Sequence, residues 1–268
     1  MSEHRSVSQF REYNRCPQAY YLKRVVRAWE RPAAWLPQGT AVHAAAEQWE
    51  KSGRLMPLME AEKVFRLAYA ESVDALSEVT PRHDFWMSSG RFKGREDIHR
   101  RFDMGLAQVG AYVDYYTRIA PEEVVWTPPG AGPIIEHEFS LDLDGVLVKG
   151  FIDLAVYRPK SGLVVRDLKT GTDPGDDFQL VVYVVALQDE FDVSIAGGDY
   201  MMIRRTKPTE PFRPKPTRVF DLSAWPRTRL VDEFGLLDES IRAEKFDPKP
   251  DKATCTRCPV RAECSFAA

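Results

Sequence analysis

Long hydrophobic runs are missing from this sequence: no stretch reaches the ~18 apolar residues that a membrane-spanning helix needs. The first residues, Met1-Ser-Glu-His-Arg5, also lack the apolar segment of a signal peptide. We therefore expect a cytoplasmic protein with no membrane partner. Internal repeats and low-complexity segments are missing too, while 44% of the 268 residues are hydrophobic, enough to bury a substantial core in one large or two small domains.

An excess of positive charge is also missing, because the sequence has 37 basic and 40 acidic residues and a net charge of −3. This balance alone argues against a nucleic-acid-binding protein, but the distribution of charge matters more than its sum. Basic residues alternate with aromatic ones in 20–29 and cluster again in 91–101 and 204–218. These stretches fit phosphate contacts and base stacking, and a solvated helix face explains each of them equally well. Our candidate nucleic-acid contacts are Tyr20, Arg24, Arg27, Arg204 and Arg205.

Cysteine is scarce, and its placement is uneven. Three of the four cysteines, Cys255, Cys258 and Cys264, lie close together, and Cys16 lies far away in sequence. In a cytosolic chain such a group indicates a metal site rather than disulfides. Four thiolates suffice for one tetrahedral Zn²⁺ or one iron–sulfur cluster. The alternative is three incidental cysteines in a flexible tail.

The most informative stretch is 148–171, where two β-branched runs flank a turn at 159–162. Asp167 and Lys169 point the same way, because strand side chains alternate between faces. A turn with an odd number of residues places Asp153 opposite Asp167 on that same face. We therefore predict an odd-length turn and a site built from Asp153, Asp167 and Lys169.

Two carboxylates and an ammonium on one face are costly to leave unpaired, and a divalent cation with hard oxygen ligands removes that cost. Mg²⁺ or Mn²⁺ suits these ligands. Lys169 can then orient or deprotonate a water beside the metal, which is the chemistry of phosphodiester hydrolysis. The alternative is an ordinary hairpin with an Asp167–Lys169 surface pair.

Three motifs together resemble the RecB-type nucleases of the PD-(D/E)xK superfamily: Gly150-Phe-Ile-Asp153, Asp167-Leu-Lys169-Thr-Gly171 and Gln179-x-x-x-Tyr183. The resemblance implies that both aspartates bind metal, that Lys169 is catalytic, and that the helix with Gln179 and Tyr183 supports the site and contacts DNA. Ile152 replaces the proline of the superfamily's name and Asp167 takes the second acid position, which leaves the ligand chemistry intact.

His43 by itself reads as a core histidine on a helix that begins at Gly39 and Thr40. In the resembled family, however, Gly-x-x-x-His is the first active-site motif, and its histidine is a metal ligand. Gly39 and His43 match it, and the Leu168 carbonyl is a further expected ligand. Glu47 either orients the imidazole or is solvated. Either Glu136 or Glu138 can approach the metal from the preceding strand, and a solvent-facing glutamate is equally possible.

The opening of the chain resembles the CRISPR-associated RecB-like exonucleases, the fourth Cas family. Ser6 and Ser8 precede Cys16-Pro17 and the aromatic residues that follow, and the C-terminal spacing is Cys-x₂-Cys-x₅-Cys. The resemblance implies that Cys16, Cys255, Cys258 and Cys264 bind a structural [4Fe–4S] cluster, with Zn²⁺ the less favoured occupant. Such a cluster would tie the N-terminal helices to the C-terminus.

The expected fold is α/β (α+β), a restriction-endonuclease-type core with a central mixed sheet flanked by helices. Expected helices cover 57–79, 95–120, 178–191 and 225–244, and expected strands cover 134–141, 146–157, 193–205 and 217–222, with a proline-rich loop at 207–216. We interpret the chain as one RecB-like domain in four parts: N-terminal helices (1–38), an inserted helical subdomain (39–132), the nuclease core (133–222), and a C-terminal helix with the cysteine-cluster cap (223–268).

The function expected from these patterns is metal-dependent exonucleolytic hydrolysis of DNA that is single-stranded or has free ends. A homo-oligomer, or partner proteins of CRISPR adaptation or recombination, fits this expectation, and so does phage DNA metabolism. The competing hypothesis is a non-catalytic nucleic-acid-binding or adaptor protein with a structural Zn or Fe–S site. It explains the cysteines and basic segments equally well, but it leaves the joint presence of His43, the two aspartates, Lys169 and Gln179 without a reason.

Overall fold

A computed structural model describes residues 4–222 and 224–268. Met1–Glu3, which belong to the stretch without the apolar segment of a signal peptide, lie outside the described residues. The chain divides into two compact units. The central unit comprises 33–138 and 151–222, and the terminal unit comprises 1–32, 139–150 and 223–268. No helix within the described ranges is both long enough and apolar enough to cross a bilayer.

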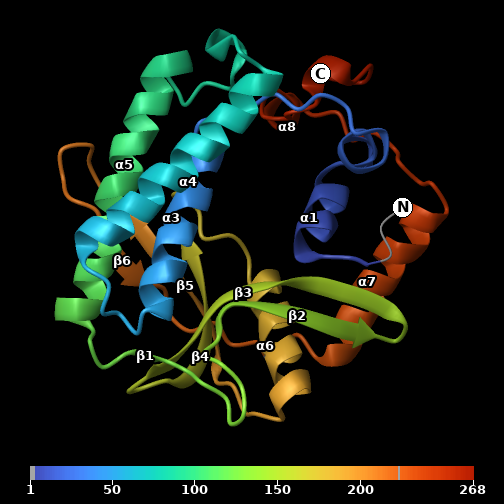
Figure 1. Ribbon diagram of the computed structural model, residues 1–268. Coiled ribbons are helices and arrows are strands. Elements are labelled where there is room, and N and C mark those ends of the chain that lie inside the picture. Colours follow the sequence, from blue (N-terminus) through green and yellow to red (C-terminus); the bar gives the residue numbers. More distant parts are fainter. Residues whose placement is uncertain (1–3, 223) are drawn as a thin grey trace. The chain divides into compact units, whose positions relative to one another are not determined.

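The central unit is built on a mixed sheet whose strands run in the order β1-β3-β4-β5-β6, with β2 also paired to β3 (Figure 1). β4 and β5 are parallel, whereas β1–β3, β3–β4 and β5–β6 are antiparallel pairs. The strands are β1 Val124–Val125, β2 Ile135–Leu143, β3 Val146–Arg158, β4 Gly162–Lys169, β5 Gly197–Arg204 and β6 Arg213–Pro216.

Two turns set the register of the sheet. Asp144 and Gly145 both have positive φ, 51° and 88°, which is the geometry of a tight hairpin turn and is typical of an Asp-Gly pair. Between β3 and β4 the pairing closes at Arg158↔Gly162, so the turn has an odd number of residues, as predicted. Leu154↔Arg166 is the last pair, and continuing its register by one residue aligns Asp153 with Asp167.

Helices cover both faces of this sheet (Figure 1). The helix α6 (Phe178–Phe191) connects the parallel strands β4 and β5 and packs so closely that a Cβ on Gly198 would lie 2.8 Å from the Leu180 Cβ. The other face meets α3 (Trp35–Lys51) and α5 (Gly94–Asp114), with α4 (Leu58–Val79) packed against both of them. One core joins these helices to the sheet through large buried side chains, among them Trp49, Phe65, Tyr112, Val164 and Ile203. This is the mixed α/β fold expected from the sequence.

The terminal unit begins with α1 (Val7–Arg15), α2 (Pro17–Tyr20) and a π-helical turn at Tyr21–Val26, and ends with α7 (Arg227–Arg242) and α8 (Lys252–Thr256). The Ser6 side chain caps α1 by accepting a hydrogen bond from the Gln9 backbone N at 3.2 Å, and Pro17 opens α2. Arg5 joins the two ends of the chain through a 2.6 Å ion pair with Asp238 of α7.

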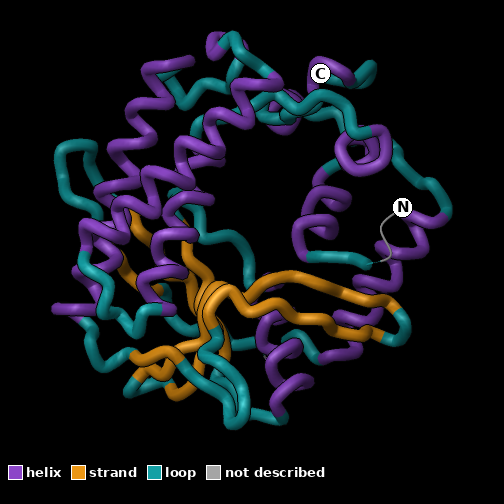
Figure 2. Tube along the Cα trace, viewed as in Figure 1, coloured by secondary structure: helices purple, strands orange, loops and turns teal. Residues whose placement is uncertain are grey.

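Two sequence-based expectations were wrong in detail. The strand expected at 217–222 lies instead at Arg213–Pro216, inside the stretch interpreted as a loop, and 217–222 contributes only an isolated bridge from Phe220 to Gly198. The helix carrying His43 begins at Trp35 rather than at Gly39. Figure 2 distinguishes the helices, strands and loops of the described residues by colour.

Candidate metal centre and cysteine pocket

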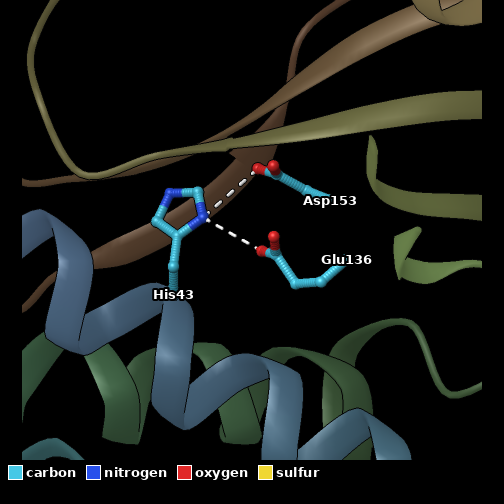
Figure 3. Close-up of side chains that lie close together, drawn as sticks. All are labelled: His43, Glu136 and Asp153. Carbon is cyan, nitrogen blue, oxygen red and sulfur yellow. Dashed lines mark ion pairs between the residues drawn. The ribbon is translucent and has the colours of Figure 1, made fainter. Parts of the chain in front are cut away.

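Three potential metal ligands meet in the central unit: His43 from α3, Glu136 from β2 and Asp153 from β3 (Figure 3). One ligand atom from each lies within 4.8 Å of the other two. His43 Nδ1 is 3.4 Å from Asp153 Oδ2 and 3.5 Å from Glu136 Oε1. The opposite nitrogen, Nε2, is 3.0 Å from the Leu168 carbonyl oxygen. The imidazole therefore lies between two carboxylates and the carbonyl that the sequence placed among the ligands.

Glu136 reaches the site because the backbone turns there. Its φ is +45°, a left-handed conformation that is uncommon for a residue with a side chain. Regular alternation of exposed and buried residues in β2 begins only after this point, where Glu138 is exposed. The structure thereby selects Glu136 from the two glutamates that the sequence left open.

The second aspartate and the lysine form an adjacent pair on β4. Lys169 Nζ lies 2.6 Å from Asp167 Oδ2 and 5.3 Å from the centroid of the Tyr200 ring. Asp153 Oδ2 accepts a hydrogen bond of 2.7 Å from the backbone N of Leu168. This last contact joins β3 to β4 at the point where their functional side chains project.

Gln179 links the Asp167–Lys169 pair to α6. Its Nε2 donates to Asp167 Oδ1 at 2.7 Å and lies 2.6 Å from the Tyr183 hydroxyl, and Lys169 Nζ donates to Gln179 Oε1 at 3.4 Å. Tyr183 is only 6% exposed. Burial raises its pKa well above the usual value, and the charges of Asp167 and Asp153 add to the effect, so its hydroxyl stays protonated.

The electrostatics of this site reflect crowded negative charge. Burial and the neighbouring Asp167 charge raise the pKa of Asp153 to about 7, although His43 opposes the shift. Burial disfavours the imidazolium of His43, but Asp153, Glu136 and Asp167 outweigh burial and raise its pKa to about 9. Protons thus bind tightly where carboxylates gather without a sufficient counter-charge.

This donor set fits a divalent cation. It offers carboxylate oxygens, one imidazole nitrogen and a backbone carbonyl, which suit Mg²⁺ and Mn²⁺. A cation there would also relieve the crowding that raises the pKa of Asp153. The group borders a small pocket that also touches Glu47, Glu50 and Tyr112. Glu47 itself pairs with Lys51 at 2.5 Å rather than with His43.

Comparison with known proteins agrees with this geometry. The sequence matches the PD-(D/E)XK nuclease superfamily over residues 4–265. The chain belongs to this superfamily. As a PD-(D/E)XK protein it is 44% identical over 264 residues to the "Gene 69 protein" of Mycobacterium phage D29, covering 97% of this chain and 96% of that protein. It is 42% identical over 283 residues to the "Gene 69 protein" of Mycobacterium phage L5, covering 97% and 95%.

The terminal unit of this PD-(D/E)XK protein contains a pocket lined by all four cysteines, Cys16, Cys255, Cys258 and Cys264. Cys16, Cys258 and Cys264 pack on a small apolar cluster of Ala19, Leu22 and Val260. Burial raises the pKa of the Cys258 thiol, and Cys16 and Cys264 raise it further. Within the described ranges, no three cysteine sulfurs lie within 4.8 Å of one another.

The candidate nucleic-acid contacts lie in different environments. Tyr20 is 3% exposed and packs face to face with Phe246, so it has no free face for a base, which corrects its assignment as a stacking residue. Arg24 is exposed and pairs with Glu12 at 2.8 Å, and Arg27 is exposed. Arg204 is exposed at the end of β5, while Arg205 stacks on Phe212 with its guanidinium 4.8 Å from the ring centroid.

Sequence reasoning missed Gln108 of α5, which is fully buried and contacts the end of β4. Its Nε2 donates to the carbonyl of Thr170 at 3.0 Å and to that of Ile203 at 2.8 Å. Its Oε1 accepts a 2.6 Å hydrogen bond from Gln38 Nε2. The only signal in the sequence was a glutamine among the apolar positions of an otherwise amphipathic helix.

Proposed function

We propose that this chain is a metal-dependent DNA exonuclease. The observation that carries the proposal is the convergence of His43, Glu136 and Asp153 within 4.8 Å, next to the Asp167–Lys169 pair. These residues come from α3, β2, β3 and β4, so only the folded chain assembles them. An adaptor protein has no need of a charge cluster that raises the pKa of one of its own aspartates to about 7.

His43, Glu136, Asp153, Asp167 and the Leu168 carbonyl would hold Mg²⁺ or Mn²⁺, which supplies Lewis-acid polarisation and lowers the pKa of water when bound. The ammonium of Lys169 stands beside Asp167 and stabilises negative charge that develops on the phosphate. Gln179 orients Asp167 and Lys169 through hydrogen bonds to both. Tyr183 in turn contacts Gln179 and remains neutral, so it adds no further negative charge.

The four-cysteine pocket supports a second part of the proposal, a structural [4Fe–4S] cluster in the terminal unit. Two thiolates on one Zn²⁺ with bonds of about 2.3 Å cannot be more than about 4.6 Å apart. All four cysteines line the pocket, yet in the described part of the chain no three of their sulfurs lie within 4.8 Å of one another. A group of several atoms suits this spacing better than a single ion, and a visible absorption spectrum of protein purified without oxygen separates the two.

Both curated relatives come from phages. We therefore place the proposed activity in phage DNA metabolism, ahead of CRISPR adaptation.

The test uses linear single- and double-stranded DNA labelled at the 5′ or 3′ end, together with circular single-stranded DNA. Each substrate is incubated with Mg²⁺, Mn²⁺ or EDTA. We expect metal-dependent degradation of linear DNA with circular DNA left intact, and the label that survives gives the polarity. Cleavage of the circle would show an endonuclease instead.

Lys169→Ala should abolish degradation, because it removes the ammonium beside Asp167. Lys160→Ala is the matched control, since Lys160 is exposed in the turn that precedes β4, at the opposite end of the strand from Lys169. Full activity in folded Lys169→Ala contradicts the assignment of Lys169. No cleavage of any substrate by folded, cluster-loaded wild-type protein favours the adaptor.

A further inference from the structure

A basic segment lies beside the candidate site in the central unit. Six basic residues and a single acidic one occupy 204–218, although the whole chain has a net charge of −3. This segment comprises the end of β5, the following loop and the edge strand β6 (Figure 1). Positive charge is therefore concentrated at one edge of the sheet.

The strand register connects this edge to the site. Lys169 of β4 pairs with Met202 of β5, and Met202 pairs with Lys215 of β6. In the same way, Arg204 stands opposite Arg213. Because side chains of registered neighbours project from the same face, Arg204, Arg213 and Lys215 share the sheet face of Lys169. Neighbouring strands are about 4.8 Å apart, so the Lys215 backbone lies roughly 10 Å from that of Lys169.

These three side chains face solvent. Arg204, Arg213 and Lys215 are exposed. Pro214 and Pro216 alternate with the two β6 cations, so they belong to the other face of the sheet, and they are partly buried. Within the described residues, none of the three cations has an acidic group within 4.0 Å, and the one acidic residue of the segment, Glu210, pairs with Lys207 at 3.9 Å.

Like charges directly opposite each other destabilise a sheet. The Arg204↔Arg213 pair is such a case, with Lys215 two residues further along the same face. A polyanion bound across them would remove the repulsion. The phosphates of this polyanion would then extend along β6 from the scissile phosphate beside Lys169.

We propose that Arg204, Arg213 and Lys215 form a phosphate track that binds the DNA strand being cut, on one side of the scissile phosphate. The proposal rests on the nuclease function proposed above and adds that the substrate extends over several nucleotides beyond the metal centre. The track begins at Lys169 and follows β6 along the edge of the sheet. Arg205 is outside it, because its guanidinium is stacked on Phe212.

A different role is open to such an edge strand. Lysine and proline on edge strands prevent pairing with other chains, and β6 carries both. That role predicts self-association when the charges are removed, and no change in the affinity for DNA. The two roles are therefore separated by measuring both properties on one variant.

The experiment compares the wild type with the triple variant Arg204→Gln, Arg213→Gln, Lys215→Gln. Binding of a fluorescein-labelled single-stranded oligonucleotide is followed by anisotropy in Ca²⁺, across a series of salt concentrations. Loss of three phosphate contacts should weaken binding at least about tenfold and reduce the slope of log K against log[salt] by about 2. Bis(p-nitrophenyl) phosphate is small enough to reach the metal centre without contacting the track. Its hydrolysis in Mn²⁺ should therefore be unchanged.

The matched control removes the same charge elsewhere, with Lys63→Gln, Arg66→Gln and Arg118→Gln, three exposed helix cations that each pair with an acid on their own helix. It should bind DNA like the wild type. Equal weakening in both triple variants, or self-association of the track variant with unchanged affinity, overturns the track. Failure of the wild type to hydrolyse the small diester, while it still binds DNA through these cations, overturns the nuclease function but leaves the three cations as a DNA-binding surface.

Discussion

Glu136 shows what a single backbone conformation contributes to the site. Its left-handed φ of +45° places its carboxylate 3.5 Å from His43, whereas Glu138, two residues further along β2, is exposed. Alternation along an ideal strand would put both glutamates on one face. The irregular residue therefore distinguishes a candidate ligand from a surface residue.

Glu136→Gln should weaken metal binding at least about tenfold, because a neutral amide replaces a charged oxygen ligand. The affinity for Mn²⁺ is measured by isothermal titration calorimetry, and DNA degradation is assayed over a range of Mn²⁺ concentrations. Glu138→Gln is the matched control and should leave both properties unchanged. Equal Mn²⁺ affinity in the two variants would remove Glu136 from the ligand set.

The raised pKa values of Asp153 and His43 make the stability of the metal-free protein depend on pH. The pKa of Asp153 rises from 3.8 to about 7, and that of His43 rises from 6.5 to about 9. The folded state thus holds more protons than the unfolded state between about pH 4 and pH 9. The contribution of this site to stability is present at low pH and decreases as the pH rises through that window.

Asp153→Asn removes most of that dependence, because the amide does not ionise. In EDTA, the variant should gain melting temperature relative to the wild type between pH 5 and pH 8.5. Mn²⁺ should stabilise the wild type more at pH 8.5 than at pH 5, since metal and protons compete for the same atoms. A difference between variant and wild type that is constant with pH would contradict the raised pKa of Asp153.

Helix α5 joins the helices of the central unit to the strand that carries Lys169. Gln108 donates to the carbonyls of Thr170 and Ile203, at the ends of the parallel strands β4 and β5, and Gln38 of α3 donates to Gln108. Arg101 extends the chain of hydrogen bonds by donating to Gln38 at 2.9 Å. A buried polar chain of this kind is stable only when its members have partners.

Gln108→Leu should lower the free energy of unfolding by about 1–3 kcal/mol, because it leaves carbonyl groups buried without a donor. Urea unfolding measures the loss. Gln188→Leu on the exposed side of α6 is the matched control, with an expected change within about 0.5 kcal/mol. If the two variants unfold alike, Gln108 does not hold the strand ends.

Elements with a strong local pattern were predicted well. The bounds of α6 match the prediction, because Leu180, Val182 and Val184 lie in one unbroken apolar run. The edge strand β6 was missed because Pro214 and Pro216 resemble a loop, although an edge strand tolerates prolines whose missing N–H groups face away from the sheet. Its pairing with β5 is a tertiary contact that no local pattern indicates.

At the scale of the whole molecule, the cysteine pocket joins the two ends of the chain. Cys16 and Cys255 are separated by more than two hundred residues, yet both line one pocket in the terminal unit. Lys249 adds a further link, with its backbone N 3.5 Å from Cys16 Sγ. A group bound by all four cysteines would stabilise the fold directly, because the unfolded chain cannot hold them together.

Cys258→Ala should lower solubility and reduce the melting temperature by more than about 4 °C, even though the candidate catalytic residues are untouched. Differential scanning fluorimetry follows melting, and visible absorbance follows the cluster. Arg257→Ala is the matched control, since Arg257 is exposed between two of the cysteines. Unchanged melting of Cys258→Ala would show that the pocket has no structural role.

The sequence by itself determined the hairpin, its odd turn and the alternation that aligns Asp153 with Asp167, since these depend on strand period and turn chemistry over about twenty residues. It also determined which residue types were available as ligands. Only the tertiary structure decided that Glu136 rather than Glu138 joins His43, that Tyr20 is buried, and that β6 aligns its cations with Lys169. These outcomes depend on a left-handed residue, on packing between distant segments and on strand pairing, none of which local periodicity encodes.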